Sequence, residues 1–285
     1  MGSNQIRRLG VVGAGQMGSG IAQVSASWGF ETHLIDTQDS ALSRSQANIS
    51  KSLEKLAEKE RLKGQDPQQI IDRITFDHSF SDLRSCQLII EAVPENEDIK
   101  KQVLTKLGSL EVKDSIIASN TSSIPITRLA TYYPYPEKCI GMHFMNPVPL
   151  MTLVEVIPGL QTSETTLEGV MAITKELGKT PIRSQDFPGF TVNRILMPMI
   201  NEAFFTLYEG IASPEDIDRG MKLGTNQPMG PLQLADFIGL DTCLAIIEIL
   251  YHGFGDPKYR PCPLLKKMVE AGHLGKKCGQ GVYRY

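Results

Sequence analysis

The sequence predicts an α/β protein in which a doubly wound, mostly parallel sheet is followed by an all-helical domain. First, strand-like apolar runs alternate with helix-like stretches over about the first 185 residues, the pattern of βαβ units. Second, the strand-like runs stop after residues 186–189 (DFPG), and only helical patterns punctuated by Pro, Ser or Gly follow. We therefore expect two domains, 1–186 and 187–285.

The first domain divides into six strands before the region around residue 150. The expected strands are 9–15, 32–37, 74–77, 87–93, 115–120 and 138–144. The expected helices are 16–29, 40–63, a short helix after Asp66-Pro67, 98–110 and 123–133. Residues 38–73 are too long for a plain crossover, which needs only about a dozen residues. This segment therefore predicts a helical insertion.

The second domain is expected to contain five helices, at 189–210, 213–224, 230–240, 241–255 and 263–272. Ser213 is a suitable N-cap, and Pro214 fits the first helical position. A domain of about 100 mostly helical residues buries only a small hydrophobic core. We therefore expect one helical face to be buried against a second copy of the chain, as a homodimer.

Composition excludes several classes of function. The net charge of −3 gives no basic surface for nucleic acid. The apolar runs are shorter than the ~20 residues of a membrane span, and no secretory signal is recognisable, so we expect a cytoplasmic protein. The five cysteines contain no CxxC pair, which favours free thiols and no bound metal.

Residues 13–18 (GAGQMG) match G-x-G-x-x-G between an apolar strand and a helix. The glycines permit a tight turn and let the backbone approach a pyrophosphate at the helix N-terminus. Asp36 ends the next strand, 18 residues after Gly18, where an acid can bind a ribose 2′-hydroxyl and repel a 2′-phosphate. The pattern predicts a Rossmann-type domain that uses NAD, with these cofactor-binding residues: Gly13, Gly15, Gln16, Met17, Gly18 and Asp36. The alternative is a glycine turn followed by a solvated aspartate.

Residues 141–156 (GMHFMNPVPLMTLVEV) are apolar apart from one histidine and one glutamate. The turn-forming centre, MNPVP, predicts a hairpin. If Pro149 is its midpoint, His143 and Glu155 face each other about 5 Å apart at Cβ. Glu155 can then hold one ring nitrogen of His143 protonated, so that the other exchanges a proton with substrate. A His–Glu pair can also be a purely structural hydrogen bond.

Several sequence blocks together resemble the 3-hydroxyacyl-CoA dehydrogenases. The blocks are GAGQMGSGIAQ, ASNTSSIPI, GMHFMNPVP, LVEVI, DFPGFTVNRI, PMGP and the terminal GKKCGQGVYRY. The resemblance covers essentially the whole chain and is strongest to short, stand-alone bacterial members that act on 3-hydroxybutyryl-CoA. It implies an NAD-dependent oxidoreductase that interconverts (S)-3-hydroxyacyl-CoA and 3-oxoacyl-CoA in fatty-acid or butyrate-type metabolism.

The resemblance also implies roles for individual residues. His143 matches the catalytic histidine, Glu155 the acid that orients it, and Ser122 and Asn193 the groups that bind the substrate oxygen. Both can donate hydrogen bonds to an oxygen that becomes charged. The positions that match NAD contacts are Glu95, Lys100, Asn120, Asn146 and Lys277, and Asn120 also matches a contact to the acyl-CoA. For Lys100 and Lys277 the alternative is a solvated charge.

In the resembling family, the insertion is a helical hairpin that helps to bind CoA, and Ser52 and Lys59 occupy the matching positions. Seven residues apart on a helix, these two differ by only ~20° in direction. The alternative is a solvated helix face, because Glu54, Glu58 and Glu60 balance the nearby lysines.

Two other functions fit parts of the pattern. One is a non-enzymatic protein that binds NADH or acyl-CoA on a dehydrogenase scaffold, and the presence of both His143 and Glu155 argues against it. The other is a related β-hydroxyacid or imine reductase, which would share the first domain. The NTSS and HFMNP blocks and the CoA-type insertion argue against that alternative.

Overall fold

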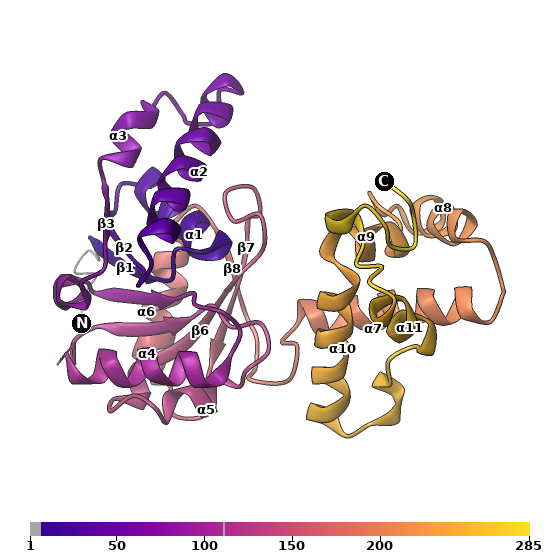
Figure 1. The fold of residues 1–285 in the computed structure, drawn as a ribbon. Coiled ribbons are helices and arrows are strands. Elements are labelled where there is room, and N and C mark those ends of the chain that lie inside the picture. Colours follow the sequence, from indigo (N-terminus) through magenta and orange to yellow (C-terminus); the bar gives the residue numbers. More distant parts are fainter. Residues whose placement is uncertain (1–6, 111) are drawn as a thin grey trace. The chain divides into compact units, whose positions relative to one another are not determined.

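The computed structural model describes residues 7–110 and 112–285. The chain divides into two compact units (Figure 1). The first unit ends at Asp186, and the second spans Phe187–Tyr285. Within the described residues, no helix is both long and apolar enough to cross a membrane.

The first unit is built on one eight-stranded sheet with the order β3-β2-β1-β4-β5-β6-β7-β8. Neighbouring strands from β3 through β6 are parallel, β7 is antiparallel to β6, and β8 is parallel to β7. The mostly parallel, doubly wound sheet is therefore confirmed. The strands are β1 (Arg8–Val12), β2 (Glu31–Ile35), β3 (Ile74–Asp77), β4 (Leu88–Glu91), β5 (Ile116–Ser119), β6 (Cys139–Phe144), β7 (Leu153–Pro158) and β8 (Thr180–Arg183).

Helices cover both faces of this sheet. They are α1 (Gln16–Ser27), α2 (Asp39–Glu58), α3 (Pro67–Ile71), α4 (Glu97–Ser109), α5 (Ile126–Ala130) and α6 (Glu164–Glu176), with short helices η1 (Phe80–Ser85) and η2 (Pro136–Lys138). Side chains alternate between faces along each strand. Val11 packs in the cluster that includes Ile21 of α1, whereas Val12 packs in the cluster that includes Leu104 of α4. Burial of each such side chain stabilises the fold by about 1.5–3 kcal/mol.

Several observed elements differ from the expected ones. The helix expected at 123–133 is only α5, because Pro125 forces the residue before it out of helical geometry. The helix expected at 40–63 ends at Glu58. The expected elements do not include α6 and β8. The strand β8 gives little sequence signal, because it is a four-residue strand at the sheet edge that contains Pro181.

The second unit is a helical bundle. Its elements are α7 (Val192–Tyr208), α8 (Pro214–Thr225), α9 (Pro231–Ile238), α10 (Leu240–Phe254), η3 (Pro257–Tyr259), α11 (Pro263–Glu270) and η4 (Lys276–Cys278). Ser213 accepts a hydrogen bond from the Asp216 amide at 3.1 Å, so the predicted cap of α8 is confirmed. The buried Asp218 carboxylate accepts the amides of Leu232 and Gln233 at the start of α9.

Candidate active site

His143 and Glu155 form a buried pair on the antiparallel strands β6 and β7. The two residues are direct partners in the strand register, which confirms the pairing predicted from the hairpin pattern. The imidazole Nδ1 lies 2.7 Å from Glu155 Oε2. Glu155 is fully buried and His143 is 8% exposed. A carboxylate at this distance fixes the ring orientation and stabilises an imidazolium, which is the arrangement of an oriented general acid/base.

Ser122 lies in the loop that follows β5 and is held by Glu95. Glu95 Oε1 accepts the backbone amide of Ser122 at 2.9 Å and its hydroxyl at 3.3 Å. The hydroxyls of Thr121 and Ser123 also donate to this oxygen, each at 2.6 Å. Burial raises the pKa of Glu95, but the Lys100 ammonium and the hydroxyl donors outweigh it and hold that pKa below its usual value. The NTSS loop is therefore organised around one ionised carboxylate.

Asn120 connects this loop to the strand that carries His143. Its Oδ1 accepts the backbone amide of Phe144 at 2.9 Å, and its own amide donates to the carbonyl of Glu91 at 2.8 Å. Asn120 thus joins the carboxyl ends of β4 and β6, through its backbone amide and its side chain respectively, so that Ser122 and His143 belong to one end of the sheet.

Lys100 is buried rather than solvated. Its side chain is 1% exposed, and its ammonium lies 2.8 Å from Glu91 Oε1 and 3.4 Å from Glu95 Oε2. Glu91 is fully buried at the end of β4 and also accepts the Ser119 hydroxyl at 2.6 Å. The alternative of a solvated Lys100 is therefore wrong. Removal of one partner from such a buried pair costs roughly 3–5 kcal/mol, so the pair shapes this end of the sheet.

The glycine loop has the geometry that a dinucleotide requires. Gly13 has φ +107°, and a Cβ there would lie 2.7 Å from the carbonyl oxygen of Ala92. A Cβ at Gly18 would collide with the carbonyl oxygen of Gly13. A Cβ at Gly15 would meet no heavy atom within 4 Å, at the N-terminus of α1, which has no side-chain cap. This open space beside an uncapped helix N-terminus fits a pyrophosphate.

Asp36 and Asn146 both contact this loop. Asp36 Oδ2 accepts the Ala14 amide at 2.8 Å, and Asp36 Oδ1 accepts the Gln38 amide at 3.0 Å. Gln16 Nε2 donates to Asn146 Oδ1 at 3.1 Å. Met17 is partly buried and packs against the core of this unit. The structure therefore brings the predicted cofactor residues of β2, α1 and the β6–β7 loop together.

The insertion is the helical pair α2 and α3, shown rising from the sheet in Figure 1. Ser52 lies in the last two turns of α2 and is partly buried, whereas Lys59 is exposed and is the residue that ends the helix. The hairpin is tied to the end of α1, because Arg73 donates to the Ala26 carbonyl and Gln65 donates to the Ser27 carbonyl.

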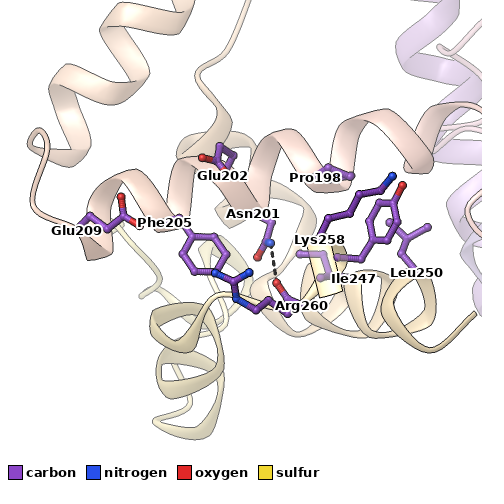
Figure 2. Close-up of a pocket in the computed structure, with 10 residues that line it drawn as sticks. Pro198, Asn201, Glu202, Phe205, Glu209, Ile247, Leu250, Lys258 and Arg260 are labelled. Atoms are coloured by element: carbon purple, nitrogen blue, oxygen red, sulfur yellow. Dashed lines mark hydrogen bonds between the residues drawn. The ribbon is translucent and has the colours of Figure 1, made fainter. Parts of the chain in front are cut away.

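Asn193 and Lys277 belong to the second unit. Asn193 is 8% exposed, in the first turn of α7. Lys277 donates to both carboxylate oxygens of Asp241, at 2.6 and 2.7 Å, and its side chain is 47% exposed. The second unit also contains a pocket of about 190 Å³ between α7, α10 and η3 (Figure 2). Asn201 and Arg260 line that pocket and are joined by a hydrogen bond of 3.0 Å. The pocket includes none of the predicted site residues.

Two residues around the site were not recognised from the sequence. The sequence pattern assigns no role to Glu91, which lies inside the expected strand 87–93, or to Lys179. An acid inside the apolar run LIIEAV was a usable signal for Glu91, because an acid seldom occurs in a fully buried strand without a partner. Lys179 carried no such signal.

Comparisons with known proteins agree across the whole chain. Residues 8–187 match the family model "3-hydroxyacyl-CoA dehydrogenase, NAD binding domain", and residues 189–285 match its C-terminal domain. The chain is 56% identical to a probable 3-hydroxybutyryl-CoA dehydrogenase of Deinococcus radiodurans, over 98% of this chain and 100% of that one. It is 49% identical to the 3-hydroxybutyryl-CoA dehydrogenase of Bradyrhizobium diazoefficiens, over 98% and 96% of the two chains.

A solved structure gives the same result. The crystal structure of (S)-3-hydroxybutyryl-CoA dehydrogenase from Ralstonia eutropha superposes with a TM-score of 0.96 at 53% identity, over 99% of both chains. The chain therefore belongs to the 3-hydroxyacyl-CoA dehydrogenase family and is an NAD-dependent oxidoreductase.

Proposed function

We propose that the protein interconverts (S)-3-hydroxybutyryl-CoA and acetoacetyl-CoA with NAD. The observation that carries this proposal is the buried His143–Glu155 pair at the sheet end that also bears the glycine loop. Oxidation of an alcohol next to a nicotinamide needs one general acid/base, and this pair is suited to be one. The names of the relatives supply the acyl-CoA substrate class.

His143 moves the proton in both directions. In oxidation, Nε2 of His143 accepts the hydroxyl proton, and the Glu155 carboxylate at Nδ1 stabilises the imidazolium that forms. In reduction, the imidazolium returns that proton to the substrate oxygen. Bound NAD supplies the hydride acceptor, and NADH the hydride donor. A contribution of about 10²–10⁴-fold in rate is typical for such a group.

Ser122 and Asn193 donate hydrogen bonds to the substrate oxygen. Donors aimed at an oxygen that gains charge in the transition state lower the barrier more than the ground state. Glu95 supports this role by accepting the Ser122 amide at 2.9 Å, which fixes the loop. The Ser122 hydroxyl has one proton, so it gives up its longer 3.3 Å bond to Glu95 when it donates to the substrate oxygen. Asn193 is supplied by α7 of the second unit.

The remaining ligand contacts fall to two groups of residues. NAD is contacted by the glycine loop and by Asp36, Glu95, Asn120, Asn146 and Lys277. The Lys100 ammonium is buried, so Lys100 acts through its ion pair with Glu95. Ser52 and Lys59 contact CoA from the end of α2, and Asn120 also contacts the acyl-CoA. An exposed lysine suits a phosphate as a point charge.

We infer that the second unit is a substrate-binding and dimerisation domain, and that the protein is a homodimer in the cytoplasm. Its surface carries large apolar side chains that are mostly exposed, which supports an interface with a second copy. These are Ile195 at 68%, Ile211 at 69%, Leu223 at 80% and Phe237 at 58% exposed.

The test is NADH consumption, measured at 340 nm, with acetoacetyl-CoA and with longer 3-oxoacyl-CoAs. Highest kcat/KM with acetoacetyl-CoA is expected, and it should fall as the acyl chain lengthens. A free 3-oxo acid without CoA is the control and should react poorly. Tight NADH binding without turnover of any thioester would identify a non-enzymatic binding protein. Better turnover of the free acid would identify a β-hydroxyacid reductase.

A further inference from the structure

Lys179 is a buried cation that the proposed chemistry does not use. It lies in the turn between α6 and β8 and is 9% exposed. Its ammonium donates to the carbonyl oxygen of Val148 at 2.6 Å and to that of Met151 at 2.7 Å. Within residues 7–110 and 112–285 it forms no ion pair, and burial lowers the pKa of its ammonium. Burying a charge without a counter-ion costs free energy. The contacts that the Lys179 ammonium makes must therefore account for its position.

Lys179 holds the loop between β6 and β7. This loop covers residues 145–152, and both acceptor carbonyls belong to it. The amides of Leu150 and Met151 donate to the carbonyl of Pro147 at 3.0 Å, which closes a tight turn above the ammonium. Two short charge-assisted bonds to one turn restrict the loop more than neutral bonds would.

The opposite side of the loop rests on the cofactor helix. Val148 is 2% exposed and packs against Gly20 of α1, where an added Cβ would lie 2.8 Å from Val148 Cβ. Asn146 in the same loop accepts a hydrogen bond from Gln16 in the first turn of α1. The loop is therefore clamped between α1 on one side and the Lys179 ammonium on the other.

We propose that Lys179 is a positioning residue for cofactor binding, which keeps the β6–β7 loop in the shape that presents Asn146 beside the glycine loop. This inference rests on the proposed role of Asn146 as a contact to NAD. The His143–Glu155 pair is held separately, by the backbone ladder between β6 and β7. Loss of the Lys179 ammonium should therefore weaken cofactor binding and leave proton transfer intact.

The test compares Lys179→Met with Lys179→Arg. Methionine keeps an apolar stem but donates no hydrogen bond, whereas arginine keeps a charged donor. The dissociation constant of NADH is measured by fluorescence without substrate, and KM and kcat are measured with acetoacetyl-CoA. Lys179→Met should bind NADH about tenfold more weakly, with kcat at saturating NADH within about twofold of the parent. Lys179→Arg should recover part of the loss, and Lys175→Met, on the exposed face of α6, should behave as the parent.

Gly20→Ala displaces the same loop from the other side, with Lys179 in place. Gly20→Ala should also weaken NADH binding, and it provides a second test if Lys179→Met does not fold. Unchanged NADH affinity in both variants would overturn the inference, and so would a fall in saturated kcat at constant NADH affinity. A parent enzyme that binds NADH but does not turn over acetoacetyl-CoA would refute the proposed substrate, and the NADH measurement would still test Lys179.

Discussion

Glu95 accepts hydrogen bonds from both the backbone amide and the hydroxyl of Ser122, at 2.9 and 3.3 Å. Sequence similarity assigns these two residues to different ligands, NAD and substrate. Under these proposed assignments, their contact makes one carboxylate shape both binding sites. Lys100 lies beneath this carboxylate, at 3.4 Å, and joins it to the buried Glu91.

Glu95→Gln should raise KM for both NADH and acetoacetyl-CoA several-fold, because the Ser122 loop loses its ionised acceptor.

Glu95→Gln should also lower the free energy of unfolding. The pKa of the Glu95 carboxyl is held below its usual value in the folded protein. The ionised carboxylate therefore stabilises the fold at pH values above the pKa that Glu95 has in the unfolded chain. This stabilisation is lost as the pH falls through the lower pKa of the folded state. Urea unfolding should show a constant gap to the parent between about pH 8 and 5 that shrinks at more acid pH. The exposed Glu168→Gln is the control. A rise in KM for NADH without a rise in KM for acetoacetyl-CoA would show that Glu95 does not shape the substrate site.

Asp36→Ala should weaken NADH use and narrow the preference over NADPH. In its proposed role, the Asp36 carboxylate accepts the ribose 2′-hydroxyl of NADH and repels the 2′-phosphate of NADPH. It also accepts the Ala14 amide, so some loss with NADPH is expected as the glycine loop loosens. The measurement is kcat/KM with each cofactor in parent and variant. Equal or better activity of the parent with NADPH would contradict this role.

Lys59→Ala should raise KM for acetoacetyl-CoA, most at low ionic strength, because an exposed lysine on a phosphate acts through a screened charge. A truncated thioester such as acetoacetyl-N-acetylcysteamine lacks the CoA phosphates and should be almost unaffected. Lys51→Ala is the matched control, since it is exposed on α2 but lies about 100° around the helix from Ser52. Equal damage to both substrates would favour the solvated helix face.

Cys278 should be the one thiol of the native protein that reacts rapidly with Ellman's reagent. It is exposed, whereas the other four cysteines are buried. Backbone hydrogen bonds at Gln280 and Leu274 lower the pKa of Cys278, and burial raises the pKa of Cys86, Cys139 and Cys243 to about 12. Reactivity follows the thiolate, so the reaction should begin below the usual thiol pKa. Cys278→Ser should abolish the fast phase, and its persistence would contradict the burial of the other thiols.

The sequence predicts the features that depend on local pattern. Taking Pro149 as the midpoint of the MNPVP turn makes His143 and Glu155 partners, so their register could be predicted before the structure. The glycine loop and Asp36 follow from strand–turn–helix chemistry in the same way. These elements are specified by neighbouring residues.

Features that depend on distant backbone could not be read. Lys100 looks like any helix-surface lysine until α4 folds back on β4 and brings it to Glu91, nine residues earlier. Lys179 binds carbonyl groups, which every residue has, so no residue type marks its partners. The short edge strand β8, with Pro181 in it, has no alternating apolar pattern to reveal it.

A double-mutant cycle of His143→Gln and Glu155→Gln tests the central claim most directly. His143→Gln should lower kcat by about 10²–10⁴-fold, and Glu155→Gln by a smaller factor. Each variant is first checked for folding by circular dichroism and thermal unfolding, because breaking a buried pair can destabilise the domain. If the two residues act as one acid/base unit, the double variant should be little slower than His143→Gln alone. Losses in kcat that multiply in the double variant would contradict the account.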